Sequence, residues 1–258
     1  MEQTLQTFIT QGVFAFILTF VRVGAAATIM PGIGDSMVPQ NIRLYIALAL
    51  SLVLMPMVLP YLPNPVPTTM VLFILIAAEF IIGVFIGTIA RILMTALDTA
   101  GMIISMQSGL GNAQVFNPAM AAQGSLIGAL LSLTGVTLLF VTDLHHLLFY
   151  GLLGSYEVFP VGQIPDSGSM AELISKVIAS SFMIGVQLSA PFIVLSMMLY
   201  IGMGVLSRLM PQVQVFMLSL PLQITLSLLT LMLMFSAGML FWLTKFEEGM
   251  MFFFGAGG

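Results

Sequence analysis

Cysteine is absent from the 258-residue chain, and charged residues make up only 6% of it. Without cysteine the chain can form no disulfide, no zinc–thiolate site and no thiol nucleophile. Ten acidic residues outnumber six basic ones, and the net charge of −4 provides no basic surface for nucleic acid. The motifs of serine hydrolases, zinc proteases and nucleotide-binding loops are also missing. We therefore expect no enzymatic activity and no cofactor.

What the chain has in quantity is apolar side chains, at 59% of residues with a mean hydropathy of +1.13. No soluble domain buries so large an apolar fraction, so we expect an integral membrane protein. Six segments reach or approach the roughly 20 residues that a helix needs to cross a bilayer. They cover residues 8–30, 44–62, 70–90, 126–153, 176–206 and 213–243. The period-two alternation of a transmembrane barrel is missing. The predicted fold is all-α, with about six long hydrophobic helices in hairpins.

Proline and arginine refine this prediction. Pro191 and Pro221 fall inside the last two segments and predict kinks there. Arg43, Arg91 and Arg208 fall in alternate connections, which lie on one side of a protein with six spans. Because arginine favours the cytoplasmic side, we expect both termini on the outside.

Residues 101–123, between the third and fourth segments, are the longest stretch that is neither charged nor able to span a membrane. Gly109 and Gly111 permit backbone angles that other residues resist, and Asn117-Pro118 favours an extended or turned backbone. Irregular backbone at membrane depth is tolerated where protein buries it or where it lines a wet cavity. We predict a central re-entrant or pore-lining loop, with an ordinary solvent loop as the alternative.

Arg22 falls inside the first predicted span, and Glu79 falls near the middle of the third. A charge at the bilayer centre costs about 2.5 kcal/mol or more unless it is paired or hydrated. We expect both side chains to face other protein groups, and we consider them candidate partners for each other. A buried ion pair that fixes helix register and a polar pathway for ions or protons are the two interpretations.

Further charges lie near the ends of the predicted spans. Arg91 and Asp98 are seven residues apart, on one helical face, and are expected to solvate the end of the third span. Asp143 precedes His145 and His146. Adjacent histidines on a helix point about 100° apart, so we expect a polar collar at the end of the fourth span and no metal site.

Residues 155–169 are the only stretch with the composition of a soluble linker, because proline, glycine and polar residues are concentrated there. We therefore divide the chain into a four-helix front part over 1–154, a linker over 155–175, and a helical hairpin with a tail over 176–258.

Three segments together resemble a known family. They are RVGAAATIMPGIGDSMVPQNIRLYIALALSLVLMP from Arg22, AGMIISMQSGLGNAQVFNPA from Ala100 and GVLSRLMPQVQVFMLSLPLQI from Gly204. Their order and spacing are similar to those of the FliR family of flagellar biosynthesis proteins and their injectisome relatives. The resemblance implies a subunit of the bacterial type III protein export gate in the inner membrane, at the flagellar basal body.

The resemblance also implies partners and site residues. FliP-like and FliQ-like subunits would join the chain in a helical hetero-oligomer that conducts unfolded proteins, and other export apparatus proteins would be further partners. The front part would be FliP-like and the C-terminal hairpin FliQ-like. A loop would plug the channel, through Gly109, Leu110, Gly111, Val115, Phe116, Asn117 and Pro118. The connection that carries Arg208, Pro211, Gln214 and Phe216 would lie at the cytoplasmic entrance.

Two other functions compete with an export channel. A proton-coupled small-molecule secondary transporter would use the broken central segment, with Glu79 or Asp143 as proton carrier. A passive scaffold of a larger machine would differ only in that the loop never lines a pore.

Overall fold

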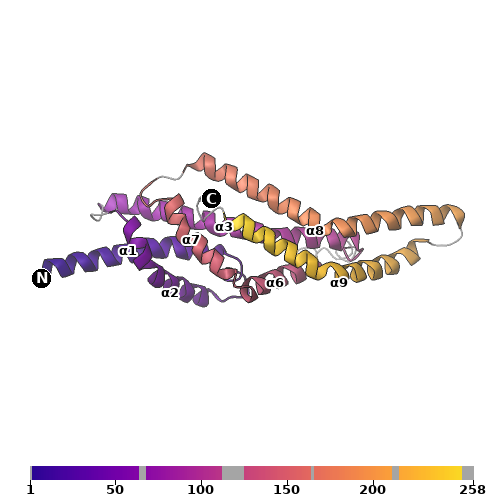
Figure 1. Ribbon diagram of the computed structural model, residues 1–258, viewed down its shortest axis with the longest axis horizontal. Coiled ribbons are helices and arrows are strands. Elements are labelled where there is room, and N and C mark those ends of the chain that lie inside the picture. Colours follow the sequence, from indigo (N-terminus) through magenta and orange to yellow (C-terminus); the bar gives the residue numbers. More distant parts are fainter. Residues whose placement is uncertain (1, 64–67, 112–124, 164–165, 211–214, 252–258) are drawn as a thin grey trace. The chain divides into compact units, whose positions relative to one another are not determined.

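The computed structural model describes residues 2–63, 68–111, 125–163, 166–210 and 215–251. Within these ranges every regular element is a helix (Figure 1). They are α1 (Glu2–Ile29), α2 (Gln40–Val58), the short 3₁₀ helix η1 (Leu59–Tyr61), α3 (Thr69–Gln107), α6 (Leu126–Val141), α7 (His145–Val158), α8 (Ser167–Leu209) and α9 (Val215–Met250). Five of these are long and apolar enough to cross a membrane, which confirms the prediction of an all-α membrane protein.

The segment predicted over residues 126–153 is two helices, α6 and α7, separated by Thr142–Leu144. Asp143 has a φ of 60° at this break. A left-handed residue cannot continue a right-handed helix, so the helix predicted over this segment is broken at Asp143. The pair has the form of a broken span or a re-entrant segment.

Helix α3 is longer than predicted, because it continues past residue 90 for 17 further residues to Gln107. Its 39 residues extend about 58 Å, well beyond the roughly 30 Å of hydrocarbon. Arg91 and Asp98 therefore lie within α3, and the expectation that they mark its end is wrong. Arg91 pairs with Asp35, and Asp98 accepts a hydrogen bond from Ser132.

This extension also corrects two other expectations. Residues Gly101–Gln107 of the predicted central loop are helical. Arg91 does not lie in a connection, so it no longer supports the orientation that was inferred from arginine. At the predicted linker, α7 ends at Val158 and α8 begins at Ser167, which leaves residues 159–166 between the helices.

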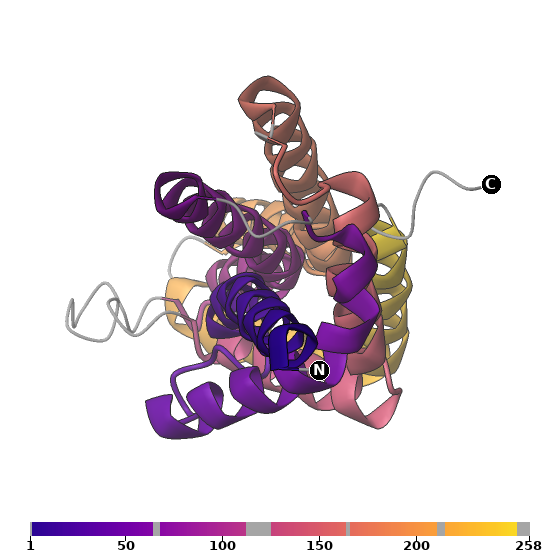
Figure 2. The ribbon, with the colours of Figure 1, turned by 90° about the vertical axis from the view of Figure 1, so that its left-hand side faces the viewer.

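The chain forms two compact units, each described here by itself. The first comprises residues 1–93, 142–177 and 247–258. In it α1 packs along α2 (Figure 2). Gly83 and Gly87 of α3 lie against the backbone of α1, and a Cβ on Gly87 would approach the Ala26 carbonyl oxygen to 2.8 Å. The spacing of these glycines thus allows two membrane helices to approach closely.

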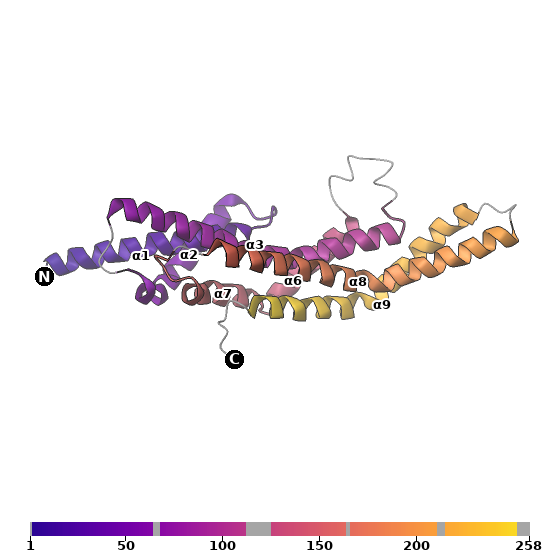
Figure 3. The same ribbon diagram turned by 90° about the horizontal axis from the view of Figure 1, so that it is seen from above.

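The second unit comprises residues 94–141 and 178–246. It holds the C-terminal part of α3, with α6 and most of the hairpin of α8 and α9 (Figure 3). Gly101 of α3 lies directly on Gly128 of α6, and a Cβ on Gly101 would overlap the Gly128 backbone. Helices α8 and α9 continue through Pro191 and Pro221 without interruption.

Candidate functional site

The two charges predicted inside the membrane, Arg22 on α1 and Glu79 on α3, form a buried ion pair in the first unit. Arg22 Nε lies 2.5 Å from Glu79 Oε2, and Nη2 donates to Oε1 at 2.9 Å. The two side chains are 0% and 1% exposed. Two parallel N–H···O bonds give this pair a fixed geometry as well as charge neutralisation. Both carboxylate oxygens of Glu79 are thereby occupied.

Helix α7 and the residue that follows it supply further partners of Arg22. Its Nη1 donates to Ser155 Oγ at 3.1 Å, and Nη2 donates to the Phe159 carbonyl oxygen at 2.9 Å. The Tyr156 ring faces the guanidinium, with Cζ 3.8 Å from the ring centroid, a cation–π contact. Sequence analysis missed Ser155 and Tyr156 because the neighbouring prolines and glycines suggested a linker. The cluster joins α1, α3 and α7.

A second group of charges in the first unit holds the turn between α1 and α2. Asp35 Oδ2 accepts the N–H of Gly32 at 2.8 Å, while Oδ1 pairs with Arg91. Arg43 donates to the carbonyl oxygens of Asp35 and Val38 at 2.7 and 2.9 Å. Gly32 has a φ of 85°, which favours glycine at this position. Arg91 and Arg43 thus order a turn, and Asp35, which no sequence pattern singled out, is its centre.

Asp143, His145 and His146 meet at the break between α6 and α7. Their potential ligand atoms all lie within 4.8 Å of one another, and the histidine ring centroids are 4.1 Å apart. The expectation that the two rings diverge is therefore wrong, although both histidines belong to the first turn of α7. The Asp143 and His146 side chains are 77% and 57% exposed. The three side chains form a polar cluster at the helix break.

The central loop begins in the second unit with a tight turn after α3. Gly109 has a φ of 78°, and its N–H donates to the Met106 carbonyl oxygen at 3.3 Å. The N–H of Gly111 donates to the Ser105 carbonyl oxygen at 2.9 Å. Ser108 and Gly109 are buried, and Leu110 and Gly111 are half-buried. Glycine at position 109 is what lets the chain reverse direction here.

The other predicted loop residues are only partly described. Val115, Phe116, Asn117 and Pro118 lie outside the described residues, as do Pro211 and Gln214 of the predicted entrance. Arg208 is exposed in the last turn of α8. Phe216 belongs to the first turn of α9, whose side chains are not described there.

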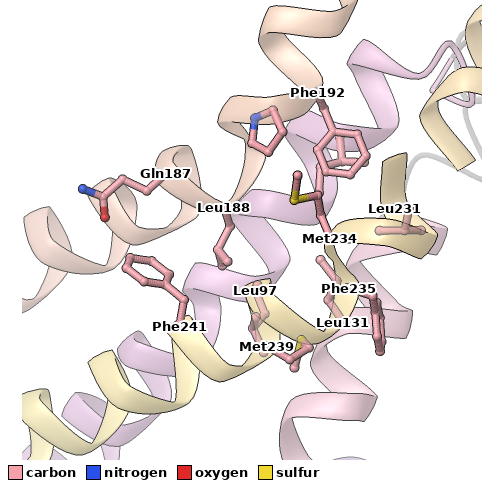
Figure 4. Close-up of a pocket in the computed structure, with 13 residues that line it drawn as sticks. Leu97, Leu131, Gln187, Leu188, Phe192, Leu231, Met234, Phe235, Met239 and Phe241 are labelled. Atoms are coloured by element: carbon pink, nitrogen blue, oxygen red, sulfur yellow. The ribbon is translucent and has the colours of Figure 1, made fainter. Parts of the chain in front are cut away.

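An apolar cavity of about 280 Å³ lies in the second unit between α3, α6, α8 and α9 (Figure 4). Leu97, Leu131 and Phe235 are among its lining side chains. Gln187 is the one polar side chain in its described lining, and no described lining residue is charged. The described lining thus offers no ionisable group to a charged solute or a proton.

Comparisons with known proteins agree on one family. The model of "Bacterial export proteins, family 1" matches residues 13–249. The flagellar biosynthetic protein FliR of Caulobacter vibrioides is 41% identical over 213 residues, which cover 82% of this chain and 84% of that protein. FliR of Aquifex aeolicus is 31% identical over 81% of this chain and 80% of its own length. The Yop proteins translocation protein T of Yersinia pestis is 30% identical over 59% of each chain. These matches show that the chain belongs to family 1 of the bacterial export proteins.

Proposed function

We propose that this chain is a subunit of a bacterial type III protein export apparatus, where it helps form and plug a channel across the inner membrane. The observation that carries the proposal is the uncharged stretch that follows the Gly109 turn, in a chain of this family. Relatives named for flagellar biosynthesis match more of the chain than the Yop translocation relative does. This difference favours the flagellar basal body.

The chemistry of the loop suits a plug. An apolar constriction closes a pore by excluding water and needs no charge. Leu110, Val115 and Phe116 would provide the apolar surface, and Asn117 and Pro118 would follow it. The turn at Gly109 and Gly111 would let the loop swing aside for an unfolded protein.

The partners follow from the division of the chain. We propose that the front part, 1–154, takes the place of a FliP-like subunit and the hairpin, 176–258, that of a FliQ-like subunit in a helical hetero-oligomer. In such an assembly, α3 and α8 would project beyond the bilayer, because each is longer than one crossing requires. The connection with Arg208, Pro211, Gln214 and Phe216 would face the cytoplasm at the entrance.

The alternative function, a proton-coupled transporter, loses one of its two candidate carriers. Both oxygens of Glu79 are bound by Arg22, so the carboxylate cannot exchange a proton without breaking the buried pair. The apolar cavity contains no ionisable group in its described lining. Neither feature suits ion-coupled transport of a small polar solute.

The test is ion permeability of the assembled gate. Deletion of residues 110–116 should raise leakage of small ions across the membrane, because the apolar constriction is removed. Gln163→Ala, in the connection between α7 and α8, is the control and should leave leakage unchanged. Purification should first show that each variant copurifies with two other hydrophobic proteins. Unchanged leakage of an assembled deletion variant would reject the plug, and a chain that purifies alone would favour the transporter.

A further inference from the structure

The last residue of α3, where the central loop begins, is held by both helices of the α8–α9 hairpin. Gln223 on α9 donates from Nε2 to the backbone carbonyl oxygen of Gln107 at 2.5 Å. Ser196 on α8 donates from Oγ to the side-chain oxygen of Gln107 at 2.6 Å. All these residues lie within the second unit. One backbone carbonyl and one side-chain amide therefore tie the end of α3 to two other helices.

The two side chains that make these bonds with Gln107 are buried. Gln223 is only 5% exposed and Ser196 only 2% exposed. The carbonyl of Gln107 belongs to the last turn of α3, where no helical N–H remains to satisfy it. Gln107 is half-buried, so removal of the donor from its carbonyl should cost up to about the free energy of one hydrogen bond. Gln223 is the donor that this helix end needs.

The same amide touches the turn of the loop itself. A Cβ on Gly109 would lie 3.6 Å from Gln223 Oε1 and 3.5 Å from a methyl carbon of Leu220, so α9 lines the left-handed turn. At the other end of the loop, Ser125 Oγ donates to the Gly101 carbonyl oxygen at 2.9 Å. Ser125 thus ties the return of the chain to α3, whereas the α8–α9 hairpin binds its start.

We infer that Gln223 is a positioning residue that clamps the turn over residues 108–111, so that opening of this turn requires the α8–α9 hairpin to give up Gln107. Ser196 reinforces the clamp from the other helix. Movement of the hairpin is thereby coupled to opening of the turn. The link to channel opening rests on the proposed function, whereas the clamp itself does not.

Hydrogen exchange of the assembled complex tests the clamp directly. In Gln223→Leu, which keeps the side-chain size but removes the donor, the amides of Ser108, Gly109 and Gly111 should exchange about tenfold faster or more. Exchange in α7, in the other unit, should stay unchanged. Thr225→Val is the matched control, because the Thr225 hydroxyl bonds only the Pro221 carbonyl of its own helix. It should leave the loop amides as they are.

Ion leakage of the same variants separates the clamp from the plug. Faster exchange of the turn amides together with raised leakage supports both the clamp and the plug. Faster local exchange without leakage supports the clamp and counts against the plug. Unchanged exchange in Gln223→Leu, or an increase spread over both units, overturns the clamp whatever the leakage. If Gln223→Leu does not assemble, Ser196→Ala is measured in its place. A smaller increase in exchange of the same amides is expected, and no increase would overturn the inference.

Discussion

Arg22 and Glu79, 57 residues apart in the sequence, bind each other through two hydrogen bonds in the buried core of the first unit. Arg22 also reaches Ser155 on α7 and the carbonyl of Phe159, the residue that follows α7, so one guanidinium organises three helices. The chain uses its few charges to fix how helices meet. This use explains why so apolar a sequence retains them inside its spans.

Removal of either partner should be costly. Arg22→Met or Glu79→Leu leaves an uncompensated buried charge, and each should lower the free energy of unfolding by about 3–5 kcal/mol. The double variant should lose much less than the sum, because the lone charge is gone. Unfolding of the detergent-purified chain measures all three. Additive losses would show that the pair does not act as a unit.

The Tyr156 ring should contribute separately. Tyr156→Phe keeps the aromatic face above Arg22, whereas Tyr156→Leu removes it, and only the second should lose the cation–π energy of about 1–2 kcal/mol. The same unfolding measurement compares the two variants. Equal losses in both would mean that packing, and not the ring face, accounts for the effect.

The sequence predicts the helices because long apolar runs leave a membrane chain no other structure. It also suggests that Arg22 meets Glu79, since an isolated charge there would be too costly. The break at Asp143 could not be predicted, because it depends on a left-handed backbone angle at a non-glycine residue. The extension of α3 was missed because Arg91 and Asp98 look like an exposed end. Their partners, Asp35 and Ser132, come from distant positions that no local pattern connects.

Asp35 offers a prediction about salt. Asp35→Asn retains an oxygen for the Gly32 N–H but loses the charge that faces Arg91. Because this pair is partly exposed, the loss should be about 1 kcal/mol or less and should shrink in 1 M salt. Asp35→Ala should lose more, and the additional loss should persist in salt. A salt-independent effect of Asp35→Asn would exclude the ion pair as its cause.

Asp166 offers a prediction about pH, because it caps the start of α8. Its carboxylate accepts the hydroxyl of Ser169 and the N–H groups of Ser169 and Gly168. These bonds, that of the Ser169 hydroxyl first, hold the pKa of Asp166 below its ordinary value of 3.8. Because folding lowers this pKa, the ionised carboxylate stabilises the start of α8 fully at a pH above the ordinary value. This stabilisation is lost as the pH falls through the lowered pKa.

The first turn of α8 should therefore fray in strong acid but remain intact at neutral pH. Exchange of the Gly168 and Ser169 amides, corrected for the intrinsic effect of pH, measures this. In Asp166→Asn the protection of these two amides should not change as the pH falls below 3.8. A wild-type profile that matches Asp166→Asn would show that the carboxylate is not the cap.

Glycine substitutions test whether close helix contacts hold the second unit together. Gly101→Ala would place a Cβ on the Gly128 backbone, which cannot move aside as a flexible side chain could. We expect a loss of about 1–3 kcal/mol in the free energy of unfolding. Gly202→Ala is the same chemical change on α8, where nothing lies within 4 Å of the new atom. It should be neutral or stabilising by up to about 1 kcal/mol, since alanine favours helix.

Because Ser125 binds the Gly101 carbonyl, separating α3 from α6 should also weaken the anchor at the far end of the central loop. Similar stabilities of the two variants in the detergent-purified chain would refute the close contact and, with it, this anchor.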